Sequence, residues 1–247
     1  MSFEELKKQV NNCNTLDDLF ELWKKAHKCE DDFEKTTITE TAITKNGIFD
    51  GISKNAFVKD GYICEKEYKS APQKILFILK EANIQTHRNE NQLKKPSEDS
   101  QVGFYTEYIN DPDCRDNTPK QHEKMGRMAH YIIYNEDIKD LEVVKSSLAK
   151  TAFMNVNKRG GGASTNEKKF RNYEKKYAPY IERQIEILNP DVIVIIGKTI
   201  SDMIVPDKYL DRIIKVYHTA YRYKKNIYKP DGYMKEFIEE YKIFDKT

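Results

Sequence analysis

The sequence lacks any apolar segment long enough to cross a membrane, and its first residues, MSFEELKKQVNNCN, lack the apolar core of a signal peptide. These two absences favour a cytoplasmic protein with no membrane partner. Internal repeats and low-complexity linkers are also lacking, and a length of 247 residues fits one elaborated domain better than two independent cores. We expect the protein to be a monomer.

Cysteines with the spacing of metal ligands are absent. The four cysteines lie far apart, at Cys13, Cys29, Cys64 and Cys114. Structural zinc and iron–sulfur sites usually need closer ligands, so we interpret these residues as ordinary reduced thiols. The sequence therefore predicts no metal and no cofactor.

An excess of one charge is also lacking, since the net charge of the whole chain is only +2. The charge is unevenly distributed, however. From Lys145 onward there are 21 basic and 13 acidic residues, a net charge of +8, whereas the preceding residues hold 21 and 27, a net charge of −6. This asymmetry mildly favours a polyanionic partner for the C-terminal half, although a solvated charged surface accounts for many such imbalances.

Four short, continuously apolar segments predict buried strands. They lie at residues 74–79 (KILFIL), 150–156 (KTAFMNV), 191–196 (DVIVII) and 212–218 (RIIKVYH). Helical periodicity is found at residues 16–28, 119–136, 165–189 and 233–244, and residues 57–63 (FVKDGYI) form a short strand or turn piece. Pro179 predicts a kink or a restart within the third helix. Buried strands alternating with helices predict an α/β fold with a parallel sheet covered on both faces.

Polar side chains stand at the ends of these predicted strands. Glu81 follows the first strand, Asn155 and Asn157 end the second, and His218 ends the fourth. In open parallel sheets, ligands bind beyond the carboxyl ends of the strands. Each residue also has an ordinary structural explanation; an asparagine at a strand end, for example, commonly satisfies backbone groups. Together, the residues predict a site with a carboxylate, amides and an imidazole at one edge of the sheet.

The ordered segments resemble the uracil-DNA glycosylase superfamily, particularly its microbial branches, over roughly residues 74–223. LFILKEAN is similar to a strand that ends in a Gly-Glu-Ala-Pro type of motif, with Lys80 and Asn83 replacing glycine and proline. FMNVNKRGGG is similar to a strand followed by Lys, Arg and a Gly- or Pro-rich loop. YIERQIEILNPDVIVIIG resembles the helix and strand before a Gly-Lys turn, and His218-Thr219-Ala220 stands where the family has His-Pro-Ser.

The resemblance implies a three-layer α/β/α fold with a central four-stranded parallel sheet. It assigns residues 71–247 to a glycosylase-like domain. Residues 1–70 would form a helical or mixed extension that packs on this core. The cysteine set that holds an iron–sulfur cluster in some branches is absent from this sequence.

The resemblance also implies cleavage of the N-glycosidic bond of a deaminated or modified base in DNA. Glu81 would stabilise an oxocarbenium-like sugar or orient a water, and His218 would donate a hydrogen bond to the anionic base. Asn155 would read the base edge, with Asn83 and Phe104 as further base contacts. Contacts to the nucleic-acid backbone are expected from Lys158, Arg159, Gly160, Gly161, Arg222 and Lys224.

Two other functions stay open at this point. A non-catalytic module could retain the fold and bind a base, a nucleotide or nucleic acid, since the first and last motifs depart from the family pattern. An unrelated α/β enzyme could use the glycine loop after Arg159 to bind a phosphorylated small molecule. KRGGGAST, however, matches neither a P-loop nor a dinucleotide-binding fingerprint. The sequence leaves open whether the DNA is single- or double-stranded.

Overall fold

The computed structural model describes residues 1–29, 42–44, 47–49, 57–83, 120–161, 167–197, 200–219 and 229–245. The α-helices are α1 (Phe3–Lys8), α2 (Leu16–Lys28), α4 (Glu65–Ser70), α6 (Lys120–Tyr134), α7 (Leu141–Ala149), α8 (Glu167–Leu188) and α10 (Pro230–Phe244). The strands are β1 (Ala42–Thr44), β2 (Gly47–Phe49), β3 (Gly61–Tyr62), β4 (Ile75–Asn83), β5 (Thr151–Gly161), β6 (Val192–Ile196) and β7 (Ile213–Val216). Short 3-10 helices are η1 (Val10–Asn12), η3 (Asp202–Ile204) and η4 (Asp207–Arg212).

The main sheet has five strands in the order β3-β5-β4-β6-β7. The four strands β5, β4, β6 and β7 are parallel to one another, and they coincide with the four predicted strands. The α/β class is therefore confirmed, but the predicted count of four strands is wrong. The fifth strand, β3, pairs antiparallel with β5 through Gly61 and Tyr62. It lies within the predicted strand or turn piece at residues 57–63, but two residues are too few to give a periodic signal that would place it in the sheet.

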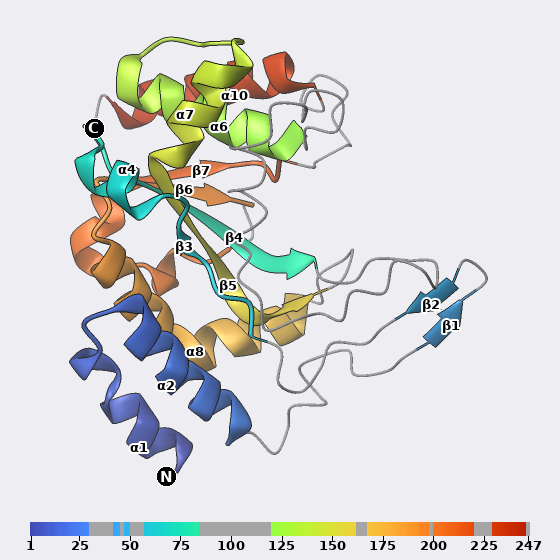
Figure 1. Ribbon diagram of the computed structural model, residues 1–247, viewed down its shortest axis with the longest axis vertical. Coiled ribbons are helices and arrows are strands. Elements are labelled where there is room, and N and C mark those ends of the chain that lie inside the picture. The colour runs from blue at the N-terminus through green and yellow to red at the C-terminus, as the bar shows by residue number, and fades with distance from the viewer. Residues whose placement is uncertain are drawn as a thin grey trace.

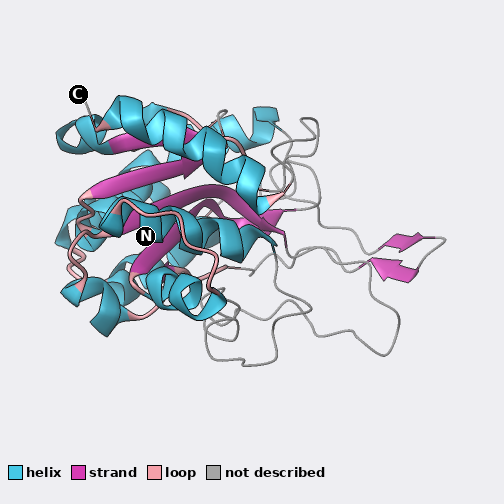
Figure 2. Ribbon diagram, turned by 90° about the horizontal axis from the view of Figure 1, so that it is seen from above, coloured by secondary structure: helices cyan, strands magenta, loops and turns pink. Residues whose placement is uncertain are grey.

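Helices cover both faces of this sheet, as Figures 1 and 2 show. The chain passes from β4 to β5 through α6 and α7, and from β5 to β6 through α8. β5 and β6 lie on opposite sides of β4, so the order of the strands reverses at β4. In α/β sheets such a reversal opens a crevice at the carboxyl ends of the strands, which is where ligands bind.

Two hydrophobic clusters fill the spaces between the three layers. One cluster joins α1, α2 and α8 to one face of the sheet, and its members include Trp23, Tyr177, Leu76 and Ile195. The other joins α6 and α10 to the opposite face, with Met128 among its fully buried residues. Because side chains alternate along a strand, neighbouring residues of β4 and β5 contribute to different clusters. The sheet is therefore buried on both faces, as its continuously apolar strands require.

The N-terminal helices share the core of the sheet. Thr15 caps α2 by accepting a hydrogen bond from the backbone N–H of Asp18, as the sequence pattern predicts. Trp23 of α2 is fully buried, and its ring stacks on Tyr177 of α8 with centroids 6.0 Å apart. Residues before position 70 thus belong to the same hydrophobic cluster as the strands. The domain boundary at residue 70 itself stays a prediction.

The last two predicted helices are present, with small differences at their ends. α8 is one helix that continues through Pro179, so the alternative of a helix restart is wrong. α10 starts at Pro230, three residues earlier than the periodic pattern indicates, because proline is favourable in the first turn of a helix. β1 and β2 pair antiparallel in a separate two-stranded sheet.

Gly126 gives a test of the contact between α6 and α7. An added Cβ at this position would lie 2.5 Å from the carbonyl oxygen of Val144 and 2.6 Å from its Cγ1 atom. Alanine is the better helix former by about 1 kcal/mol. The clash opposes this gain, and overpacking typically costs about 1–3 kcal/mol. We therefore expect Gly126→Ala to lower the free energy of unfolding, measured by denaturant titration.

The control for this substitution is Ser146→Ala on α7, at an exposed position. Surface substitutions of this kind usually change stability by less than about 0.5 kcal/mol. A Gly126→Ala protein as stable as the wild type would show that the helices do not pack this closely.

Candidate active site

Glu81, Asn155 and Asn157 of the predicted site lie within β4 and β5, whereas His218 follows β7. The ladder between β4 and β5 continues past the apolar segments and pairs Leu79 with Asn155, Glu81 with Asn157 and Asn83 with Gly161. A register shift falls between Glu81 and Asn83. The predicted ends of β4 and β5 are therefore several residues too short, because the polar residues of the ladder interrupt the apolar pattern while the backbone pairing goes on.

Glu81 has a fixed partner on the neighbouring strand. The amide nitrogen Nδ2 of Asn157 donates to Oε2 of Glu81 over 3.0 Å. The amide oxygen of Asn157 accepts a hydrogen bond from the backbone N–H of Arg159, also over 3.0 Å. Asn157 is buried, whereas Glu81 keeps partial access to solvent. The Glu81 carboxylate is thus oriented by the Asn157 side chain, whose amide oxygen is itself held by the backbone of Arg159.

Asn155 is held through its backbone. Its N–H donates to Oδ2 of Asp60 over 2.7 Å, and its carbonyl oxygen accepts from Nζ of Lys158 over 2.7 Å. The residue is 2% exposed. Strand periodicity places Asn155 and Asn157 on the same face as Phe153, which packs in the cluster with α6 and α10. Because Glu81 bonds to Asn157, it lies on that face as well.

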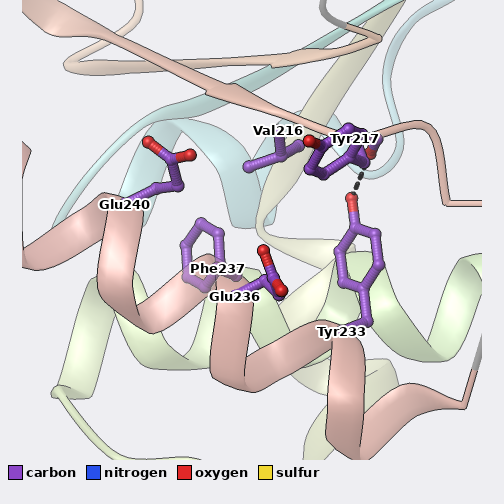
Figure 3. A pocket seen from close by; sticks show the side chains of 6 residues that line it. All are labelled: Val216, Tyr217, Tyr233, Glu236, Phe237 and Glu240. Atoms are coloured by element: carbon purple, nitrogen blue, oxygen red, sulfur yellow. Dashed lines mark hydrogen bonds between the residues drawn. The ribbon is translucent and has the colours of Figure 1, made fainter. Parts of the chain in front are cut away.

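His218 follows β7 in a segment that is anchored on both sides. The hydroxyl of Tyr233 donates to the carbonyl oxygen of Tyr217 over 2.6 Å, the dashed line in Figure 3. Nζ of Lys124, on α6, donates to the carbonyl oxygen of Thr219 over 2.6 Å and stands over the Tyr233 ring at 4.7 Å from its centroid. Two helices thus fix the backbone immediately before and after His218.

The imidazole of His218 is held in its neutral form. Desolvation of the ring lowers its pKa below the ordinary value, and the positive charges of Lys80 and Lys124 lower it further. The residue nonetheless keeps access to solvent. Since Lys80 directly precedes Glu81 on β4 and acts on His218, the ends of β4 and β7 belong to one electrostatic environment. A carboxylate and a neutral hydrogen-bond donor thus share this edge of the sheet.

Lys80 connects this edge to α8. Its ammonium forms an ion pair with Glu167, in the first turn of the helix, and lies 5.7 Å from the centroid of the Phe170 ring. The glycine that Lys80 replaces in the family motif could make neither contact. Lys80 therefore contacts α8 and also places a positive charge that acts on His218.

Lys158 and Arg159 are internal, so the structure does not present them to a phosphate backbone. The side chain of Lys158 is 0% exposed and pairs with Asp60, whose side chain is also 0% exposed. The guanidinium of Arg159, 1% exposed, lies 5.5 Å from the centroid of the Tyr173 ring and 5.6 Å from that of Tyr177. The expectation of phosphate contacts from these two side chains is thus replaced by structural roles, because both lie under α2 or α8.

The structure describes only some of the remaining predicted site residues. Gly160 and Gly161 belong to β5, where Gly161 pairs with Asn83 of β4. Phe104, Arg222 and Lys224 lie outside the described residues. From sequence alone, Asp60 and Lys124 received no role, since their partners are distant in the chain. The sequence places Asn157 among the polar residues at the strand ends, and its spacing of two from Asn155 is a signal that both face one side of a strand, but it does not indicate the hydrogen bond to Glu81.

A small pocket lies between β7 and α10, beside this segment (Figure 3). It is lined by Val216, Tyr217, Tyr233, Glu236, Phe237 and Glu240. Glu81, Asn155 and His218 are not among its lining residues, so we do not assign it to the candidate site.

Among the described residues, no helix has the length and hydrophobicity that crossing a membrane requires. In the same parts of the chain, no group of three or more His, Cys, Asp or Glu side chains is arranged to hold a metal ion.

Comparisons with known proteins identify the family. No curated protein and no solved structure matches the chain. The family model of the uracil DNA glycosylase superfamily matches residues 73–242, which contain β4, β5, β6, β7 and the whole candidate site except Asp60. Since this match covers well over half of the 247 residues, the chain belongs to the uracil-DNA glycosylase superfamily.

Proposed function

We propose that the protein is a DNA glycosylase that removes a deaminated or modified base of the uracil type. The observation that carries this proposal is the Glu81 carboxylate, oriented by Asn157, on the same sheet edge as the neutral imidazole of His218. Breaking an N-glycosidic bond leaves positive charge on the sugar and negative charge on the base. The two groups match these two charges.

Glu81 acts on the sugar in this mechanism. The bond between the sugar C1′ and the base nitrogen breaks heterolytically, and the bonding electrons leave with the base. The carboxylate stabilises the resulting oxocarbenium-like centre and orients the water that adds to C1′. Its orientation by Asn157 before substrate binds reduces the reorganisation needed during the reaction. Water supplies the hydroxyl group on C1′, and its remaining proton is released to the departing base or to solvent.

His218 acts on the base. A neutral imidazole donates from one ring nitrogen to a base oxygen, and this hydrogen bond strengthens as negative charge develops there. Lys80 and Lys124 favour the neutral imidazole, and their positive potential also favours an anionic leaving group. The same cations therefore support both the protonation state of the donor and the charge of the product.

Asn155 reads the edge of the extruded base, because one amide supplies both a donor and an acceptor. Asn83 and Phe104 are proposed as further base contacts. For the nucleic-acid backbone, we retain the main chain of Gly160 and Gly161 together with Arg222 and Lys224. Lys168, exposed in the first turn of α8, adds a cation a few residues after Gly161.

The first test is base release from DNA oligonucleotides that carry uracil, hypoxanthine or xanthine, detected as abasic sites. Glu81→Gln removes the negative charge but keeps the size of the side chain. We expect it to reduce kcat/KM by about 100-fold or more, in line with the loss of a group that stabilises transition-state charge.

The matched control is Glu239→Gln, which makes the same change at an exposed position of α10 and should leave the rate unchanged. Wild-type protein that binds these oligonucleotides without releasing a base would instead identify a non-catalytic member of the family. If the protein neither binds these oligonucleotides nor releases a base from them, both functions are excluded.

The second test is the dependence of activity on pH. The pKa of His218 is lowered, so the imidazole is neutral at pH 7 and becomes protonated only in more acidic solution. Activity should therefore rise with pH through this lowered pKa. Lys80→Met removes one of the charges that oppose protonation, so the pKa of His218 should rise and the acidic limb of the kcat/KM profile should move to higher pH.

NMR titration of the His218 ring in both proteins measures this pKa directly and separates it from the titration of carboxylates. Lys235→Met, at an exposed position of α10, serves as the control and should leave the profile in place. An unchanged His218 pKa in Lys80→Met would mean that the charge of Lys80 does not reach the imidazole.

A further inference from the structure

Asp60 sits at the centre of a completely buried polar network. Its Oδ2 atom accepts from the backbone N–H of Asn155 and from Nζ of Lys158, each over 2.7 Å. Its Oδ1 atom accepts from the same ammonium and from Nε2 of Gln184, on α8, again over 2.7 Å each. One carboxylate thus receives four hydrogen bonds from three residues.

Both backbone polar groups of Asn155 take part in this network. Lys158 completes a ring by donating to the carbonyl oxygen of Asn155 over 2.7 Å. Both backbone polar groups of Asn155 are therefore bound by the two members of one ion pair. Within the described residues, the β3 ladder does not reach Asn155, because β3 begins at Gly61, whose partner on the antiparallel strand is Phe153.

The surroundings of this ion pair exclude water and come from the N-terminal helices. The ammonium of Lys158 lies 5.7 Å from the centroid of Phe20 and 5.3 Å from that of Trp23, both on α2. Both side chains of the ion pair are 0% exposed. In such surroundings a charge–charge hydrogen bond is strong, and removing one partner alone is strongly destabilising. The position of the β5 backbone is correspondingly rigid.

Asp60, Phe20 and Trp23 all precede the family match, which begins at residue 73. We propose that Asp60 is a positioning residue for the base-binding site: with Lys158 it fixes the main chain at Asn155, so the N-terminal extension contributes to base recognition. This inference rests on the proposed function in so far as Asn155 reads the base. Asp60 does not touch the substrate; it acts through Asn155.

Loss of the network is therefore expected to affect base discrimination and turnover differently. Loss of the network lets the β5 main chain shift at Asn155, and a hydrogen-bonding side chain discriminates between bases only when its position is fixed. Glu81 is bonded to the side chain of Asn157, and the oxygen of that side chain accepts from the backbone N–H of Arg159, a residue outside the ion pair. Base discrimination should therefore fall while turnover that depends on Glu81 persists, which is a pattern that general destabilisation does not produce.

The test compares full-length wild type with the double variant Asp60→Leu/Lys158→Met. Replacing both members of a buried ion pair by apolar residues is often tolerated, so this variant is expected to fold. The measured quantity is the ratio of kcat/KM for oligonucleotides that carry one uracil or one cytosine. We expect this ratio to fall at least tenfold, through a higher KM for the uracil substrate. Backbone hydrogen exchange at Asn155 should accelerate at least tenfold.

Gln184→Met is the matched control, because it removes one hydrogen bond to Asp60 but leaves the contact between Oδ2 and Asn155. It should lower the melting temperature without changing the ratio of kcat/KM for the uracil and cytosine oligonucleotides or the rate of backbone hydrogen exchange at Asn155. If the double variant does not fold, Asp60→Asn/Lys158→Met takes its place, since it keeps the size of the Asp60 side chain and leaves no unpaired charge buried.

Two results would overturn the inference: an unchanged base ratio in a folded variant that lacks the ion pair, or equal losses in that variant and in Gln184→Met. If the wild type releases no base, the glycosylase proposal fails on its own. The positioning of Asn155 is then decided by amide exchange, and equal exchange rates in wild type and variant would refute it.

Discussion

The ion pair between Asp60 and Lys158 is the interaction on which the arrangement of the sheet edge depends. It joins three parts of the chain that are far apart in sequence: the segment before β3, the C-terminal part of β5 and, through Gln184, the C-terminal part of α8. Burial of two charges is costly unless each is paired and hydrogen-bonded, and here both conditions are met. Breaking such a pair typically costs about 3–5 kcal/mol, so the β5 backbone has little freedom to move.

Hydrogen bonds from distant parts of the chain also fix the backbone around His218, on the other side of the site. Lys124 and Tyr233 bind the carbonyl groups on either side of His218, so that two helices hold a segment that has already left the sheet. The desolvation that accompanies this packing, together with the positive charges nearby, keeps the imidazole neutral. Packing and chemistry are therefore coupled: the contacts that fix the histidine in space also set its protonation state.

Much of the fold could be predicted from local patterns. The four parallel strands are short apolar segments, and α2, α6, α8 and α10 show helical periodicity, because burial of a face imposes a repeat on the sequence. β3 lies within residues 57–63, which were expected to form a short strand or turn piece, but its pairing with β5 could not be predicted because it depends on tertiary contact. Of the site, Glu81, Asn155 and His218 could be proposed from their positions near the strand ends. Lys158 and Arg159 were misassigned because a cation after a strand looks the same whether solvent or an aromatic cluster surrounds it.

The α/β class, the family and the types of polar residue at the carboxyl edge of the sheet can be read from the sequence. These properties follow from periodicity and from the order of short motifs along the chain. Which of the polar residues are buried and paired is apparent only in the folded chain. Asp60 meets Lys158 across 98 positions and Lys124 meets Thr219 across 95. Such partners leave no local pattern, because hydrogen bonds and ion pairs depend on distance in space and not on separation along the chain.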